Sequence, residues 1–279
     1  MNKTISCPVK INLTLRILGQ KEDGYHELRS VFWKKNGREC LSVEKIDSSR
    51  HIIDVSGAKI SGKNLLDSVL EFAAEKISVP RLSLKLAKRY PQGSGIGAGS
   101  GNAATLLLWL RDNCGLDFTA EEAAKLGADV AVLTRDSALN FACGIGEKLT
   151  PVKADINLPW LLVFPKWTAS TPEAYRALEK SRNGRFETVD YEAEAGGIIN
   201  RLVRGERAGL LPNDFIANAV KEHPQYNDFF NIAERQNALA WGMCGSGSAM
   251  FAAAPADTLD NIEYELGSKE FVLATERLD

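Results

Sequence analysis

The sequence is poor in the residues that build disulfide scaffolds and metal centres. Only three histidines occur in 279 residues, and no pair of cysteines has CxxC spacing. The five cysteines are scattered along the chain: Cys7, Cys40, Cys114, Cys143 and Cys244. An odd number of isolated cysteines disfavours a structural zinc site and a disulfide framework, and it fits reduced thiols in a cytoplasm.

Long apolar runs and a strong charge bias are also lacking. No stretch approaches the roughly 20 apolar residues of a membrane span, and the first 15 residues read as a strand, not as a signal peptide. The formal net charge is −2, so the whole surface does not favour nucleic acid or an anionic membrane. A net charge does not, however, exclude a local basic patch.

Hydrophobic residues make up 44% of the chain and charged residues 25%, which is enough for one large domain or two ordinary ones. Strands early in the chain and helices later favour an α+β class with antiparallel pairing. In the first half, strands are predicted over 4–18, 27–33, 39–46, 51–55 and 82–86, and helices over 64–76, 102–113 and 119–125.

A domain boundary is predicted near residue 150, which gives domains over 1–150 and 151–279. The second half is predicted to begin with a strand region over 153–165 and to carry a surface loop over 179–187. Its other predicted elements are helices over 192–203 and 214–220, and strands over 238–243 and 249–254.

A glycine-rich loop from Pro91 to Thr105 carries the strongest functional signal. Five glycines alternate with small residues directly before a helical pattern, which lets backbone N–H groups approach an anion closely. The loop lacks the Gly-Lys-Ser/Thr ending of a Walker A motif and the acidic partner of a Rossmann fingerprint. The alternative is a flexible surface loop.

Two segments place polar or charged groups among apolar neighbours. Lys10 and Asn12 share one face of the first strand, since side chains alternate along a strand. Asp129 stands alone in Leu-Gly-Ala-Asp-Val-Ala-Val-Leu. Lys10 and Asn12 could instead face water from an edge strand, and Asp129 could instead cap a helix.

Three further motifs suggest substrate contacts. Asp23-Gly24-Tyr25-His26 offers a ring for stacking and a side chain with both donor and acceptor nitrogens. Tyr175 offers a second ring, and a tight turn over 243–249 contains Gly245 and Ser246. Taken singly, these could be an ordinary turn, a helix core position and a hairpin.

Together, and in this order, the motifs resemble those of the GHMP kinases. The resemblance implies a two-domain fold, with an N-terminal domain like domain 2 of ribosomal protein S5 and a ferredoxin-like α/β C-terminal domain. It also implies ATP with Mg²⁺. The residues it assigns to ATP are Asn64, Lys88, Pro91, Gly93, Ser94, Gly95, Ile96, Gly97, Ala98, Gly99, Ser100, Gly101 and Asn102. No carboxylate is assigned to the metal, which leaves the Ser100 hydroxyl as the one protein group expected near it.

Within these kinases, Pro-Val-Lys-Ile-Asn-Leu, Leu-Gly-Ala-Asp-Val and Gly-Tyr-His resemble motifs of the family that phosphorylates the 2-hydroxyl of 4-diphosphocytidyl-2-C-methyl-D-erythritol, a step of non-mevalonate isoprenoid synthesis. The implied roles are catalysis by Lys10 and Asp129, with the carboxylate as base. Substrate binding is implied for Asn12, Tyr25, His26, Tyr175, Gly245 and Ser246, with cytosine held between the two tyrosines.

Two alternatives stay open, and three departures from the family patterns motivate the second of them. Gly101 and Cys244 stand where serine is usual, and Ala131 stands where proline is common. The alternatives are another GHMP kinase, of homoserine or mevalonate type, and a catalytically weak nucleotide-binding protein of the same fold. The expected partner is a small molecule in the cytoplasm, with no nucleic acid or membrane, and the expected state is a monomer or weak homodimer.

Overall fold

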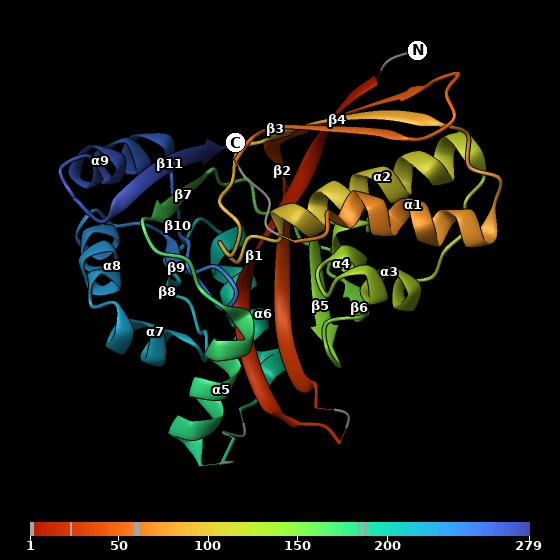
Figure 1. Cartoon of the computed structure of the whole chain (residues 1–279). Helices are drawn as coiled ribbons and strands as arrows, with labels where there is room; N and C mark the ends of the chain where they lie inside the picture. The colour runs from red at the N-terminus through yellow and green to blue at the C-terminus, as the bar shows by residue number, and fades with distance from the viewer. Residues whose placement is uncertain (1–2, 23, 59–61, 184, 187–188) are drawn as a thin grey trace.

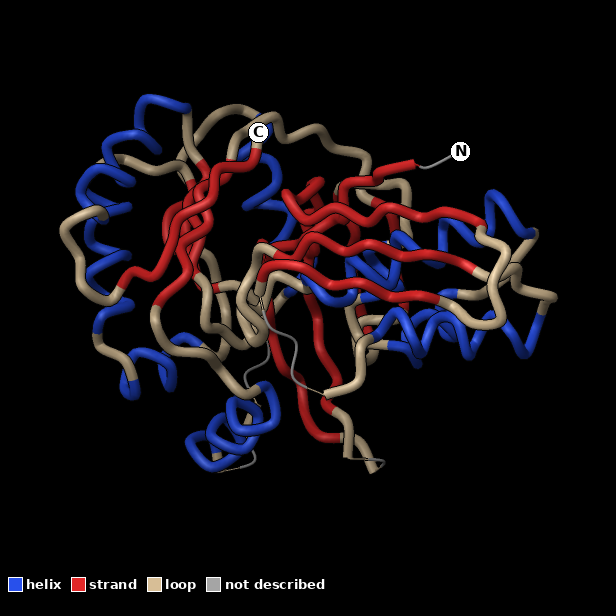
Figure 2. Tube along the Cα trace, turned by 45° about the horizontal axis from the view of Figure 1, so that its top comes forward, coloured by secondary structure: helices blue, strands red, loops and turns tan. Residues whose placement is uncertain are grey.

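The computed structural model describes residues 3–279 except Asp23, 59–61, Gly184 and 187–188. Two sheets organise these residues, and Figure 2 shows them as separate groups of strands with helices packed alongside. The six-stranded sheet has the order β3-β4-β2-β5-β6, with β1 also paired to β2. Its strands are β1 Lys3–Gln20, β2 His26–Lys45, β3 Ile52–Gly57, β4 Leu82–Lys88, β5 Leu139–Cys143 and β6 Lys148–Pro151.

The strands β1 and β2 form a long antiparallel hairpin that reaches past the rest of the sheet toward helix α5 (Figure 1). The prediction of two strands over 27–33 and 39–46 was wrong, because β2 is continuous. Its polar middle stays hydrogen-bonded to β1, with Val9 opposite Lys35 and Pro8 opposite Asn36. Backbone pairing therefore carries the strand across a stretch whose side chains lack apolar alternation.

Four helices accompany the first sheet: α1 Leu65–Lys76, α2 Ala98–Cys114, α3 Ala120–Leu126 and α4 Val130–Leu133. Helix α2 begins at Ala98, four residues before the predicted start, because the small residues of the loop already take helical geometry. Gly101 lies in its first turn, where an added Cβ atom would be 1.9 Å from the Pro8 carbonyl oxygen. The glycine at this unusual position therefore permits close packing of α2 on β1.

The five-stranded sheet has the order β11-β7-β10-β9-β8. Its strands are β7 Trp160–Pro165, β8 Gly209–Leu210, β9 Ala240–Met243, β10 Met250–Ala253 and β11 Val272–Leu278. The helices of this half are α5 Thr171–Arg182, α6 Tyr191–Val203, α7 Ile216–Glu222, α8 Gln225–Arg235 and α9 Ala256–Leu266. The predicted loop over 179–187 is partly wrong, because α5 continues to Arg182.

The predicted boundary at residue 150 falls within β6, one residue before this last strand of the first sheet ends at Pro151. The hydrophobic core does not divide there. One buried cluster joins Leu15 and Leu107 to Phe215 and Phe229. The boundary thus separates two sheets that share a core. The division into domains over 1–150 and 151–279 stays a prediction.

Candidate active site

Lys10 and Asp129 meet at the centre of the molecule. The Lys10 side chain is buried, with 4% of the residue exposed, and its Nζ atom lies 3.4 Å from Asp129 Oδ2. Nζ also donates to Asn12 Oδ1 at 3.2 Å and lies 5.3 Å from the centre of the Phe32 ring. The water-facing alternative for Lys10 and Asn12 is therefore wrong, since both are buried. A buried ammonium needs such partners.

Asp129 occupies the N-cap position of α4, but its carboxylate makes no capping hydrogen bond. A quarter of the side chain remains exposed, so one oxygen can face Lys10 while the group still reaches solvent or a ligand. Asp129 Oδ2 also lies 3.1 Å from the point where a Cβ atom on Gly97 would stand. The carboxylate therefore lies against the glycine-rich loop.

The glycine-rich loop ends as the start of α2. Gly93, Gly95 and Gly97 all have positive φ, and Gly97 caps the helix without a side-chain hydrogen bond. The first bond within the helix runs from Gly101 N to Gly97 O, so the amides of the preceding turn have no acceptor within the helix. Such amides and the positive end of the helix dipole form a ready anion site.

The turn over 243–249 docks on this loop. Ser248 N donates to Gly93 O and Ala249 N donates to Ser94 O, each at 3.0 Å. On the other side of the turn, a Cβ atom on Gly245 would lie 3.3 Å from Lys10 Nζ. The two glycine-rich segments, one from each half of the chain, therefore meet beside the Lys10–Asp129 pair.

Lys88 and Asn102 belong to a buried network at the base of the loop. Lys88 Nζ lies 2.8 Å from Glu39 Oε2, and Asn102 Nδ2 donates to the same oxygen at 2.8 Å. The other Glu39 oxygen accepts from the backbone of Arg89 and Tyr90. The network braces the chain that leads into the loop. Glu39 was not predicted as a site residue, because it lies in the polar middle of β2 and its partners are far along the chain.

The remaining loop residues have distinct local roles. Asn64 caps α1 by accepting from Leu66 N at 3.1 Å, and the buried Ile96 accepts from Lys10 N at 2.9 Å through its carbonyl. Ser100 lies in the first turn of α2, and its Oγ atom is near Gly127. Within the described ranges, no three His, Cys, Asp or Glu side chains come together as a metal site.

His26 and Tyr175 form a stacked pair, with ring centres 4.3 Å apart. Phe215 contacts the Tyr175 ring edge-on at 4.9 Å, and His26 Nε2 lies 2.5 Å from Glu179 Oε1 on α5. Tyr25 is 60% exposed on the turn before β2. The structure thus places His26, not Tyr25, on the face of Tyr175. Asp23 of the same motif lies outside the described residues.

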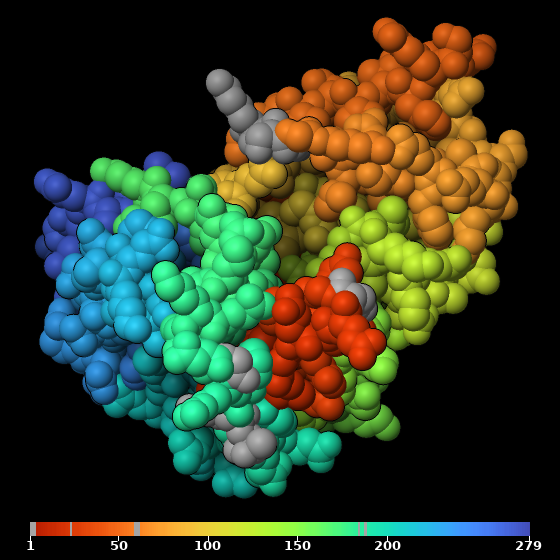
Figure 3. Space-filling model, turned by 60° about the horizontal axis from the view of Figure 1, so that its bottom comes forward, coloured from red at the N-terminus to blue at the C-terminus, as the bar shows by residue number. Residues whose placement is uncertain are grey.

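A cavity of 910 Å³ contains most of these groups, and Figure 3 shows the hollow between the two halves of the molecule. The predicted site residues that line it are Lys10, Asn12, Tyr25, His26, Gly95, Asp129, Tyr175, Gly245 and Ser246. Asn64, Lys88 and Asn102 do not line it. The residues predicted to act in catalysis and substrate binding therefore share one cavity, whereas of the thirteen residues predicted to bind ATP only Gly95 lines it.

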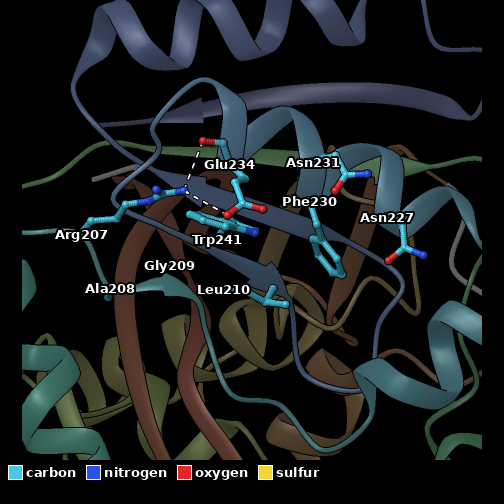
Figure 4. A pocket seen from close by; sticks show the side chains of 9 residues that line it. All are labelled: Arg207, Ala208, Gly209, Leu210, Asn227, Phe230, Asn231, Glu234 and Trp241. Atoms are coloured by element: carbon cyan, nitrogen blue, oxygen red, sulfur yellow. Dashed lines mark hydrogen bonds and ion pairs between the residues drawn. The ribbon is translucent and has the colours of Figure 1, made fainter.

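A second cavity, of 450 Å³, lies at the β8 edge of the five-stranded sheet (Figure 4). Arg207 is a charged residue that lines this cavity. Its guanidinium donates to the Glu234 carbonyl at 3.2 Å and lies 5.0 Å from the centre of the Trp241 ring. The guanidinium is therefore already engaged within the protein. The residues that line this cavity include none of the predicted site residues.

Burial raises the pKa of three tyrosines to about 12: Tyr90 and Tyr226, which are buried, and Tyr175, which is partly buried. Folding then favours the neutral phenol, so this stability is complete below pH 10 and lost as the pH rises toward 12. We expect the free energy of unfolding to fall over that window, by about 2–3 kcal/mol for each deeply buried tyrosine.

Chemical denaturation at several pH values, with phenolate absorbance, tests this expectation. Tyr226→Phe should reduce the slope of stability against pH, whereas Tyr264→Phe, at an 87% exposed position, should leave it unchanged. Equal slopes for Tyr226→Phe and the unsubstituted chain would contradict the assignment.

Comparison with known proteins identifies the family of this chain. Residues 64–145 match the model for the GHMP kinases N terminal domain, and residues 204–273 match the GHMP kinases C terminal model. The chain is 32% identical to 4-diphosphocytidyl-2-C-methyl-D-erythritol kinase of Parabacteroides distasonis, over 87% of this chain and 88% of that protein. It is 33% identical to the enzyme of that name from Chelativorans sp., over 88% and 84% of the two chains.

A crystal structure of 4-(cytidine 5'-diphospho)-2C-methyl-D-erythritol kinase superposes with a TM-score of 0.79 at 28% identity, covering 100% of this chain and 98% of that one. Homoserine kinase from Cytophaga hutchinsonii shares the fold alone. It superposes with a TM-score of 0.66 at 13% identity, covering 100% of this chain and 94% of that one. No helix in the described part of the chain is long and apolar enough to cross a membrane. The chain therefore belongs to the GHMP kinases and, among them, to the 4-diphosphocytidyl-2-C-methyl-D-erythritol kinase family.

Proposed function

We propose that this kinase transfers the γ-phosphoryl group of ATP to the 2-hydroxyl of 4-diphosphocytidyl-2-C-methyl-D-erythritol. The observation that carries the proposal is the Lys10–Asp129 pair, which lies against the glycine-rich loop in a cavity that also holds Tyr25 and His26. Phosphoryl transfer needs a phosphate cradle, a positioned base and a site for the acceptor, and the three lie together here.

The donor phosphates are assigned to the start of α2. The amides of Ala98, Gly99 and Ser100 precede the first bond within the helix, and Gly97 supplies no competing side chain. Backbone amides and a helix dipole suit a polyphosphate. The Ser100 hydroxyl, in the first turn of α2, would be the protein group that holds Mg²⁺, and the ion would neutralise charge on the phosphates.

Asp129 is proposed to take the proton of the acceptor hydroxyl as its oxygen bonds to the γ-phosphorus. The bond from that phosphorus to the bridging oxygen breaks at the same time, and ADP leaves with the electron pair. Lys10, 3.4 Å from the carboxylate, keeps a positive charge beside the reacting groups. Asn12 fixes the ammonium through its Oδ1 atom.

The cytosine is proposed to take the place that the His26 ring has on Tyr175. A flat heteroaromatic ring already stacks there at 4.3 Å, so the face accepts a group of this shape. His26 would then turn to the polar edge of the base, and Tyr25 would cover its other face. This arrangement keeps the predicted sandwich between the two tyrosines and gives His26 the reading role.

A coupled kinase assay with the cytidyl alcohol, homoserine and mevalonate tests the substrate. We expect turnover of the cytidyl alcohol alone. Removing a stacking ring should cost roughly 1–3 kcal/mol, which is about 5- to 150-fold in affinity. Tyr25→Ala, His26→Ala and Tyr175→Ala should therefore lower kcat/KM for that substrate, while ATP affinity stays nearly constant.

Tyr264→Ala is the matched control, because this exposed tyrosine lies on α9 and does not line the cavity. Melting temperatures separate lost binding from lost folding. If all three folded variants kept their kcat/KM for the cytidyl alcohol, the proposed cytosine site would be refuted, and the cytosine would have to bind elsewhere.

A further inference from the structure

The segment Pro212–Phe215 connects β8 to α7 and touches three walls of the active site. It is joined to β1 by two backbone bonds, from Leu15 N to Pro212 O at 2.9 Å and from Asp214 N to Leu15 O at 3.0 Å. Leu15 lies five residues after Lys10 on the same strand. The segment is therefore fixed to the strand that carries the catalytic ammonium.

Asn213 ties the segment to the turn at Gly245. Its Nδ2 atom donates to Gly245 O at 2.8 Å and to Met243 O at 3.1 Å. Its Oδ1 atom accepts from Phe215 N at 3.0 Å, so both donors and the acceptor of the amide are engaged. A side chain that satisfies three backbone groups at once has a fixed orientation.

The Gly245 turn that Asn213 holds forms one wall around the Lys10 ammonium. Gly245 has a φ of 55°, and a Cβ atom there would lie 3.3 Å from Lys10 Nζ and 3.0 Å from Gly95 O. If the turn moved outward, space would open beside Lys10 and the ammonium could leave its position beside Asp129. The Asn213 amide thus acts on the reacting groups through the turn.

The other end of the segment reaches Tyr175, where the cytosine is proposed to bind. The Asp214 carboxylate accepts from Ile17 N at 2.7 Å and from Arg182 of α5 at 3.1 Å. Phe215 packs edge-on against Tyr175 at 4.9 Å. One short segment therefore contacts the Gly245 turn beside Lys10 through Asn213, and it contacts Tyr175 through Phe215.

We propose that Asn213 is a positioning residue for phosphoryl transfer, because it holds the Gly245 turn against Lys10. Phe215, in turn, positions Tyr175 to stack on the cytosine ring of the substrate. The second role rests on the proposed function. The two roles predict different kinetic effects from residues two positions apart: Asn213 governs kcat and Phe215 governs the KM of the cytidyl substrate.

Asn213→Asp tests the first role, because a carboxylate keeps the shape and still accepts from Phe215 N but cannot donate to the two carbonyls. A displacement of about 1 Å can cost about 100-fold in rate, so we expect kcat to fall about 100-fold, with KM for ATP within threefold of the unsubstituted chain. Phe215→Leu should raise KM for the cytidyl alcohol about 2- to 12-fold, the range for losing an aromatic pair, with kcat within threefold.

Leu259→Ala is the control for destabilisation alone. Leu259 is buried on α9 and does not line the cavity, so this variant should lower the melting temperature and leave both constants unchanged. If Asn213→Asp does not fold, Asn213→Ala is measured below its melting temperature. A folded Asn213 variant with kcat within threefold, or one whose KM and kcat change as they do in Phe215→Leu, would overturn the positioning role. An unsubstituted chain that turns over another alcohol instead would refute the proposed substrate, while the kcat comparison could still be made with that alcohol.

Discussion

Asp129→Asn should lower kcat by about 10²–10⁴, the usual contribution of a general base. The amide has nearly the same shape as the carboxylate but cannot accept the proton of the acceptor hydroxyl. Because Asp129 makes no capping bond, its replacement should leave α4 intact. Nucleotide affinity should change little. Steady-state kinetics and calorimetry with an ATP analogue measure the two quantities.

Asp136→Asn is the matched control, since Asp136 is an exposed aspartate only seven residues further along the chain. It should keep full activity. Near-full activity of folded Asp129→Asn would show that another group removes the proton, and the Lys10–Asp129 pair would then be a structural ion pair.

Gly95→Ala should disable the enzyme by separating the two glycine-rich segments. Gly95 has a φ of 77°, which costs an L-residue roughly 1–2 kcal/mol, and the new Cβ atom would lie 1.9 Å from Cys244 O. The turn over 243–249 must move, so the bonds from Ser248 N and Ala249 N to the loop are lost, at about 0.5–1.5 kcal/mol each. We expect about 2–5 kcal/mol lower stability and at least a 100-fold loss of activity.

Gly99→Ala separates this steric effect from a general intolerance of the loop to alanine. Its Cβ atom would lie 3.9 Å from Leu65 Cδ1, an ordinary contact, in the first turn of α2. The variant should therefore fold with a stability equal to or slightly above that of the unsubstituted chain, since alanine favours helices. Equal melting temperatures for Gly95→Ala and Gly99→Ala would contradict the close approach at Cys244.

The chemistry of this site was easier to predict from sequence than its supports. Lys10 and Asp129 stand out because each is a charged residue among apolar neighbours, and that contrast is visible within a few residues. Glu39 and Asn213 act through bonds to residues far away in sequence, which no local pattern reveals. The interaction of Lys88 with Glu39 likewise depends on the pairing of β2 with β4.

The same limit applies to the fold. Helix α1 has clear apolar spacing and an Asn64 cap, and its prediction is confirmed within one residue. Helices α8 and α9 were not predicted, although each buries one apolar face. The continuous β2 could not be foreseen, because the backbone bonds that carry its polar middle come from β1.

The sharing of β1 between the two halves bears on how such proteins recombine. Residues 12–17 of β1 pair with β2 and also bond to Pro212 and Asp214. A chimera that joins residues 1–151 of this chain to the second half of a relative would inherit a strand matched to the wrong partner. We expect working hybrids to need a crossover that exchanges β1 and the segment Pro212–Phe215 together, so these two distant stretches should be inherited as one unit.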